Sequence, residues 1–274
     1  MNIYSNGNNL YSWNGPFPIH PFPWAHSGSS FGPYGHIIDT QDALGNRVLI
    51  QTWYHCINIV GAYSLMTYIS KNNGVSFVPG PVIDSVGYNL THPSMVDLGG
   101  GDLLVLACPK AYPYQFQQYV SHDYGLNWIA DTNLTQFDFG QPNDIPSPPF
   151  LSYINFEGVG IIICYYTHIF QIGSSNPPTV YQAIAPANEI VKLGLNGITS
   201  TASSWCTYRK SLQTSPLQIN TNSGFESFFH PLNQFKGIGL TFSDTGTNPG
   251  NTSVPMIIFT ETHHMLSDIL NLWP

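Results

Sequence analysis

The sequence predicts an all-β protein, a β-propeller of five or six four-stranded antiparallel blades, because two patterns recur along it. A hydrophobic hairpin pattern repeats with turn glycines at Gly45, Gly101 and Gly158, which are 56 and 57 residues apart. A polar turn also repeats, and its two copies begin 51 residues apart, at Ser70 and Ser121. Repeats of about 40–50 residues that each supply four strands are typical of β-propellers.

The composition points the same way. Charged residues make up only 8% of the 274 residues, whereas aromatic residues reach 14%. Asn, Ser, Thr, Tyr and Gln take the polar positions that Lys and Glu usually fill. This usage is typical of many short strands joined by polar turns, with few surface helices built on Glu–Lys pairs.

Three parts follow one another along the chain. Residues 1–35 are rich in aromatic residues and proline, and we expect this segment to pack on the propeller or to close it. Residues 36–262 carry the repeats and are predicted to form the propeller. Residues 263–274 place apolar side chains at helical spacing, which predicts a short helix or an interaction tail.

Each predicted blade opens with a hairpin of two hydrophobic strands and continues into a third strand. A wider gap before the last hairpin leaves room for an eroded unit, to which we assign 190–215, with two strands around an Asn196–Gly197 turn. Gly237 is expected to be the turn glycine of the last hairpin. The first hairpins are predicted at 36–54, 92–109, 148–166 and 230–243, and the third strands at 62–70, 114–121 and 178–186.

The repeated polar turn has a physical reason for each of its residue types. Short Ser and Asp or Asn side chains can hydrogen-bond backbone amides across a hairpin turn. Glycine can adopt the positive φ that such a turn needs, and the aromatic residue starts the next strand and can pack its ring in the sheet. The residues are Ser70, Asn72, Gly74 and Phe77 in the first copy and Ser121, Asp123, Gly125 and Trp128 in the second.

This Ser-x-Asp-x-Gly-x-x-Trp pattern resembles the Asp box, or BNR repeat, of the sialidase-like β-propellers. The resemblance implies a structural role at the rim of the blades, away from the axial site and without a part in chemistry. Sialidases of this family hold the substrate carboxylate with three arginines, whereas this chain has only Arg47 and Arg209. Lysine does not reproduce the bidentate fork of arginine, so we expect no sialidase activity.

We therefore expect a non-catalytic sialidase-like propeller that serves carbohydrate binding. It would recognise a glycan or cell surface, or form a structural component of a virion or extracellular assembly. The alternative is a divergent glycoside hydrolase acting on a neutral sugar, which would need two carboxyl groups about 5–10 Å apart. Candidates for that pair, each of which could instead be a carboxylate satisfied by a turn, are Asp42, Asp97, Glu157 and Glu261.

Aromatic rings beside amide and hydroxyl groups are typical of surfaces that hold sugars by stacking. His36, His92 and His230 open their predicted units, which suggests equivalent positions near one face of the propeller, although turn histidines would give the same pattern. The ligand-binding candidates are Trp53, Tyr54, His92, Tyr112, Tyr165 and Tyr166.

Charge excludes two classes of partner. With a net charge of −8 and only seven Lys and Arg residues, the chain lacks the cations that nucleic acid or anionic lipid would require. No apolar run is long enough to span a membrane, and the N-terminus lacks the pattern of a secretory signal.

The four cysteines are scattered among apolar segments, which predicts buried thiols, with disulfides as the alternative. No cofactor or metal ion is expected. Scarce charge together with many Tyr and Asn residues resembles virion and surface proteins of acid-living microbes. We therefore expect an acid-stable, extracellular or virion protein whose partners are a glycan, a host-surface component or further copies of the chain.

Overall fold

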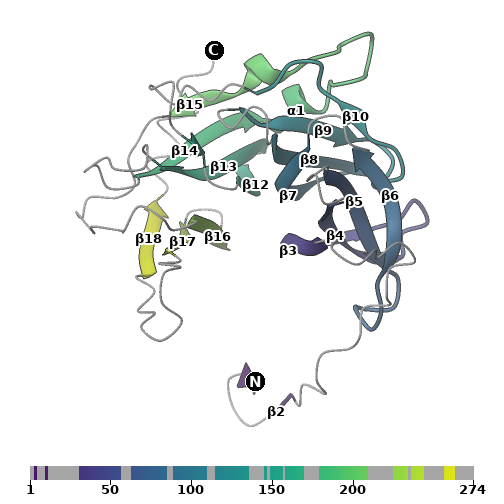
Figure 1. The fold of residues 1–274 in the computed structure, drawn as a ribbon, viewed down its shortest axis with the longest axis horizontal. Helices are drawn as coiled ribbons and strands as arrows, with labels where there is room; N and C mark the ends of the chain where they lie inside the picture. The colour runs from purple at the N-terminus through teal and green to yellow at the C-terminus, as the bar shows by residue number, and fades with distance from the viewer. Residues whose placement is uncertain are drawn as a thin grey trace.

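The computed structural model confirms the predicted fold class. Antiparallel sheets make up most of the part that it describes, and four of them fan out side by side like the blades of a propeller (Figure 1). The described residues are 3–4, 10–11, 31–56, 63–84, 89–109, 115–135, 145–146, 149–156, 158–169, 179–208, 225–233, 236–243 and 256–262.

Blades 1 and 2 are four-stranded antiparallel meanders in chain order. Blade 1 contains β3 (Phe31–Gln41), β4 (Arg47–Cys56), β5 (Tyr63–Ser70) and β6 (Val78–Asp84), and blade 2 contains β7 (Leu90–Gly99), β8 (Asp102–Pro109), β9 (Gln117–Ser121) and β10 (Ile129–Ala130).

Blades 3 and 4 repeat this plan. Blade 3 is formed by β12 (Phe150–Phe156), β13 (Val159–Ile169), β14 (Thr179–Pro186) and β15 (Cys206–Tyr208), and the short β11 (Ile145–Pro146) pairs with the end of β13. The described strands of blade 4 are β16 (Phe225–Asn233), β17 (Lys236–Ser243) and β18 (Met256–Thr262), and β1 (Ile3–Tyr4) and β2 (Leu10–Tyr11) form a separate small hairpin.

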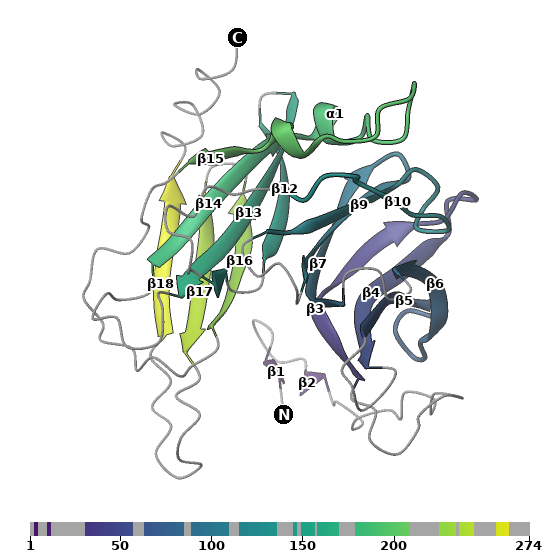
Figure 2. The ribbon, with the colours of Figure 1, turned by 45° about the horizontal axis from the view of Figure 1, so that its top comes forward.

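The first strand of each blade contacts the first strand of the next, in the order β3, β7, β12, β16. An antiparallel sheet of four strands returns the chain to the end from which it started. The inner strands therefore all begin at one end of the molecule, here called the leading face. The β3–β4, β7–β8 and β9–β10 hairpins turn at the opposite end, here called the turn face (Figure 2).

The core lies between blades, and β8 shows how the sequence builds it. Alternate residues of a strand point to opposite faces of the sheet. Leu103 and Val105 pack into a cluster shared with blade 1, whereas Leu104 and Leu106 pack into a cluster shared with blade 3. Blade 2 thus buries one apolar face against blade 1 and the other against blade 3, and each of these four side chains is fully buried.

All four opening hairpins form where the sequence predicts them. Three details of the predicted organisation need correction. Gly45, Gly101 and Gly158 have φ values of 80°, 97° and 86° at their turns, but Gly237 lies within β17, opposite Pro231 and Glu261. The first blade begins at Phe31, ahead of the expected boundary at residue 36. The predicted segment 263–274 lies outside the described residues.

The third correction concerns residues 190–208, which form no separate unit. After β14 the chain enters α1 (Ala187–Ile190), a series of turns and a 3₁₀ turn (Ala202–Ser204) before it returns to blade 3 as β15. We call residues 187–205 the strap. The strap leaves its own blade and lies beside β9 and β10 of blade 2 (Figures 1 and 2).

Buried polar groups hold the strap in this position. The indole of Trp205 donates to Gln118 Oε1 at 2.8 Å, and Gln118 Nε2 donates to Thr201 Oγ1 at 2.8 Å. The Asp131 carboxylate is 1% exposed and accepts the backbone N–H of Thr201 at 2.7 Å. The Asn196–Gly197 turn itself forms, since both residues have a positive φ, 52° and 79°, and Ile198 N donates to the carbonyl oxygen of Leu195 at 2.9 Å. The residues on either side of this exposed turn do not form the two predicted strands.

Candidate functional site at the leading face

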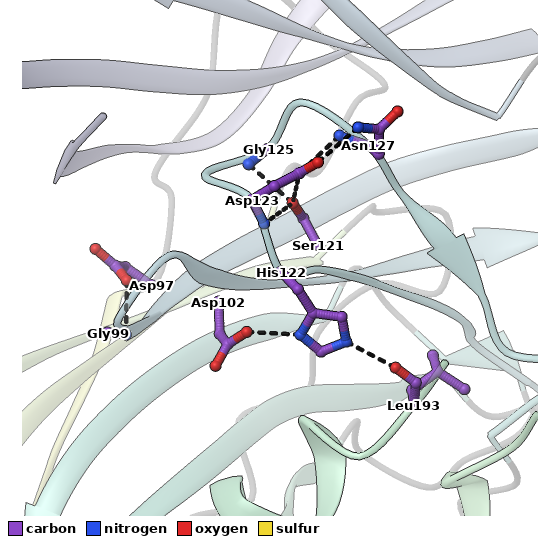
Figure 3. Close-up of polar contacts among 9 residues, drawn as sticks. All are labelled: Asp97, Gly99, Asp102, Ser121, His122, Asp123, Gly125, Asn127 and Leu193. Carbon is purple, nitrogen blue, oxygen red and sulfur yellow. Dashed lines mark hydrogen bonds and ion pairs between the residues drawn. The ribbon is translucent and has the colours of Figure 1, made fainter. Parts of the chain in front are cut away.

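The polar side chains at the turn face are committed to holding hairpins together. In the turn that follows β9, Gly125 N donates to Ser121 Oγ at 2.8 Å, and the Ser121 hydroxyl donates to Asp123 Oδ1 at 2.8 Å (Figure 3). The same carboxylate accepts Asn127 N at 2.8 Å and Asn127 Nδ2 at 2.6 Å. Burial alone would raise the pKa of Asp123, but these hydrogen bonds outweigh it and lower the pKa.

The turn that follows β5 uses the same bonds. Gly74 N donates to Ser70 Oγ at 2.9 Å, the Ser70 hydroxyl donates to Asn72 Oδ1 at 2.9 Å, and Ser76 N donates to that oxygen at 2.9 Å. Trp128 packs against the cluster between blades 1 and 2, and Phe77 packs against a smaller cluster within blade 1. Both turns thus act as local clamps on their blades.

Two of the acidic candidates accept hydrogen bonds from turn amides. Asp42 caps the β3–β4 turn by accepting Leu44 N and Asn46 N at 2.9 Å each, and the hydrogen bonds from Asn46 lower its pKa. Asp97 accepts Gly99 N at 2.7 Å beside the β7–β8 turn (Figure 3). Glu261 lies opposite Gly237, near the beginning of β17. These three residues lie toward the turn face, and Glu157 is outside the described residues.

Burial corrects two of the aromatic candidates. Trp53 is 3% exposed and packs on Tyr68 with ring centroids 4.5 Å apart, and Tyr166 is 1% exposed with its ring edge against Phe116. The Trp53 ring packs within blade 1 and the Tyr166 ring packs between blades 2 and 3. Neither ring face is therefore exposed for stacking on a sugar. Tyr54 lies in β4 opposite Leu65, and Tyr165 lies in β13 opposite Phe150. Tyr112 is outside the described residues.

The leading face differs because the inner strands of blades 1 and 2 are irregular there. In β7, Thr91 pairs with Cys108 and Ser94 with Leu106, so that His92 and Pro93 together oppose one residue. His92 has a φ of 52°, which is uncommon for a residue other than glycine. A comparable irregularity in β3 lies between Tyr34 and Ile38 and includes His36. Such β-bulges re-aim side chains and are frequent next to binding sites.

His92 is half-buried, and burial lowers the pKa of its imidazole. Two residues further along, Ser94 is buried, and its hydroxyl oxygen accepts Leu151 N at 2.9 Å. This bond joins the middle of β7 to the beginning of β12. His92 lies between two paired positions of β7, Thr91 with Cys108 and Ser94 with Leu106.

One carboxyl residue at this face was missed by the site prediction from sequence. The inner strands contain Asp39, Asp97 and Glu226, and only Glu226 lies at the leading end, as the second residue of β16. The sequence pattern placed the start of this unit at His230. Extending the apolar stretch back to Phe225 would have found Glu226 at the beginning of an inner strand.

Two absences apply to the described residues. Among them, no three His, Cys, Asp or Glu side chains gather closely enough to hold a metal ion. In the same part of the chain, no helix is long and apolar enough to cross a bilayer.

Solved structures share this fold, although no protein-family model and no curated protein sequence matches the chain. An α-L-arabinanase of Penicillium chrysogenum, complexed with arabinobiose, aligns over 88% of the chain with a TM-score of 0.55 and 17% identity. The GH93 α-L-arabinofuranosidase of Fusarium graminearum aligns over 89% with a TM-score of 0.54 and 14% identity. The family 117 glycoside hydrolase Zg3597 of the marine bacterium Zobellia galactanivorans aligns over 88% with a TM-score of 0.53 and 11% identity.

The aligned part covers 65% of the first two of these proteins and 70% of the third. The chain thus spans slightly less than two thirds of the arabinanase and of the arabinofuranosidase. At these identities the similarity extends to the fold alone. The chain has the β-propeller fold that it shares with these glycoside hydrolases.

Proposed function

We propose that the protein is a glycoside hydrolase that acts at the leading face on a neutral oligosaccharide of the arabinofuranose class. The observation that carries the proposal is the similarity of fold to an arabinanase and an arabinofuranosidase over nearly nine tenths of the chain. Fold alone does not determine function, so the proposal depends equally on which residues the fold brings to the leading face.

The supply of cations supports a neutral substrate. The chain has only two arginines, and Arg47 is bound in two places to Asp39, with Nη2 to Oδ2 at 2.6 Å and Nε to Oδ1 at 2.8 Å. Its third nitrogen donates to Asn73 in the turn after β5, so this guanidinium belongs to the turn face. At most one arginine is left for a substrate carboxylate, which argues against a sialic acid.

We propose further that the turns at Ser70 and Ser121 are Asp boxes. Their support is the shared set of hydrogen bonds together with the shared backbone: φ is 57° and 83° at Asn73 and Gly74, and 63° and 81° at Tyr124 and Gly125. In this proposal they stabilise the blades and leave the chemistry to the other face.

Glu226 is the proposed carboxyl residue of the reaction. Hydrolysis of a glycosidic bond needs one carboxyl group as acid and a second as nucleophile or base, about 5–10 Å away. Glu226 is the second residue of the inner strand β16, which begins at the leading face. The second carboxyl group would have to come from another segment at the same face.

The test is hydrolysis of arabinan, arabino-oligosaccharides and 4-nitrophenyl α-L-arabinofuranoside by the whole protein. We expect turnover, and we expect Glu226→Gln to reduce kcat by at least about 100-fold, because loss of a general acid or base typically costs this much. Glu189→Gln is the matched control, since Glu189 pairs with Lys192 at 2.6 Å on the exposed side of α1. An equal effect of both substitutions would reject the role of Glu226.

Recognition of a glycan without catalysis is the second candidate. It is favoured by the single carboxyl residue at the leading end of the described inner strands, because one such group can bind a sugar but not complete the usual pair. Isothermal titration with arabinobiose separates the two. Binding without turnover would support recognition, and the absence of both would reject the arabinofuranose class.

A further inference from the structure

The two inner-strand bulges occupy equivalent places in neighbouring blades. His36 and His92 each precede the turn glycine of their hairpin, Gly45 or Gly101, by nine residues. Each lies inside the irregular stretch of its inner strand, between Tyr34 and Ile38 in β3 and between Thr91 and Ser94 in β7. The two strands that carry the bulges, β3 and β7, contact each other.

Proline accounts for only one of the bulges. Pro93 lacks an N–H group and would interrupt the ladder of β7 by itself. The irregular stretch of β3, Gly35–Ile37, contains no proline, and Pro33 before it is paired normally with Trp53. The bulge therefore recurs at a place where no proline requires it.

The backbone at His92 is also costly. Glycine adopts a positive φ freely, whereas in other residues a positive φ costs about 1 kcal/mol or more. A histidine at a φ of 52° in an inner strand therefore requires a reason other than the turn geometry. Strained residues of this kind concentrate at binding sites, where the strain aims a side chain.

We infer that His92 is a substrate-positioning residue, whose imidazole hydrogen-bonds a hydroxyl group of the bound sugar, and that the bulge of β3 serves the same ligand. This inference rests on the proposed function, since it assumes that a neutral sugar binds at the leading face. The chemistry of the imidazole suits such a ligand. A neutral imidazole has one donor nitrogen and one acceptor nitrogen, and a sugar hydroxyl can both donate and accept.

Burial favours this neutral form of His92, because it lowers the pKa of the imidazole. The bond from Leu151 N to Ser94 Oγ holds the strand two residues away, so the ring is presented by a fixed backbone. Protonation at low pH would remove the acceptor nitrogen. Sugar affinity should therefore fall as the pH drops through the lowered pKa of His92.

Two substitutions separate contact from strain. Asparagine tolerates a positive φ and keeps an amide donor and acceptor, whereas glycine tolerates it and offers neither. By titration with arabinobiose we expect His92→Gly to bind about tenfold more weakly and His92→Asn to lie between it and the native protein, with unchanged or raised Tm for His92→Gly. In kinetics, KM should rise more than kcat falls, and the pH dependence of affinity should be lost in His92→Gly.

A double-mutant cycle tests whether both bulges serve one ligand. If they do, His36→Gly and His92→Gly should each weaken binding of arabinobiose, and the double variant shows whether the two losses are coupled. Unchanged affinity in a folded His36→Gly would overturn the shared ligand, and unchanged affinity in a folded His92→Gly would overturn the role of His92. Failure of the native protein to bind arabinobiose would reject the proposed function as well, whereas equal binding by native and variant proteins rejects this inference alone.

Discussion

At the scale of single residues, left-handed backbone positions decide where the strands reverse. Both polar turns place a non-glycine residue and then a glycine in this region, Asn73–Gly74 and Tyr124–Gly125. The glycines differ in their surroundings. A Cβ on Gly125 would lie 3.1 Å from Leu103 Cδ1, whereas a Cβ on Gly45 would meet nothing within 4 Å. Because both glycines have a φ near 80°, replacing each with alanine adds the same backbone strain. The difference between the two variants then measures the effect of packing against Leu103.

We expect Gly125→Ala to lower the free energy of unfolding by roughly 2–4 kcal/mol and Gly45→Ala by about 1–2 kcal/mol. Both variants carry the strain of a side chain at positive φ, but only the first also pushes on Leu103 in the core between blades 1 and 2. Urea unfolding of the two variants beside the native protein measures the difference. Equal losses would show that the core yields to the added methyl group without cost.

The sequence predicted these turns well because their bonds are local. Ser, Asx and Gly at fixed offsets suffice to specify the hydrogen bonds of Ser121 and Gly125. The aromatic candidates were less predictable. Whether Trp53 faces a ligand or its own blade depends on sheet pairing and on the neighbouring strand β5, which supplies Tyr68. Sequence alone does not reveal that pairing.

At the scale of elements, the strap keeps its local turn at Asn196–Gly197, but contacts with blade 2 decide where it lies. His122 joins it to blade 2 from the strand-to-turn junction after β9. Its Nδ1 lies 2.6 Å from Asp102 Oδ1 and its Nε2 lies 2.7 Å from the carbonyl oxygen of Leu193 (Figure 3). Because both partners are acceptors, the imidazolium form, which donates from both nitrogens, satisfies both bonds.

This arrangement makes the attachment of the strap sensitive to pH. Burial alone would lower the pKa of His122, but the bonds to Leu193 and Asp102 and the charges of Asp102 and Asp123 raise it above 6.5. A raised pKa in the folded state means that the stabilisation is complete below the unfolded value. It is lost as the pH rises through the folded value.

We therefore expect His122→Gln to destabilise the protein more at pH 5 than at pH 9. Urea unfolding of both proteins at the two pH values gives the difference in unfolding free energy, and hydrogen exchange of residues 190–198 reports whether the strap itself loosens. Asp102→Asn serves as the matched variant, since it removes the charge but leaves a side chain of equal size. A loss of stability that is the same at both pH values would contradict the charged form of His122.

At the scale of the whole molecule, the blades are not separate stability units, because their cores are shared. The inner hairpins could be predicted from sequence, since each is a continuous apolar pattern with a turn glycine. Which side chains pack between which blades could not be predicted from sequence, because alternate residues of β8 face different blades. Leu103 packs against blade 1 and Leu104 packs against blade 3. Glu226 was missed for a different reason, since the sequence pattern placed the start of its strand at His230 instead of Phe225.

Leu103→Ala and Leu104→Ala test this sharing from opposite faces of one strand. Each leucine is fully buried, so each substitution should lower the free energy of unfolding by about 2–5 kcal/mol. Because blade 2 is packed on both sides, we expect both variants to unfold in one transition with the same midpoint by circular dichroism and by tryptophan fluorescence. Hydrogen exchange should rise in β4 and in β13 for either variant.

The contradicting outcome is local loosening, in which Leu103→Ala raises exchange only in β4 and Leu104→Ala raises it only in β13. Each pair of neighbouring blades would then be stable independently of the others, and cooperative unfolding across the blades would be ruled out.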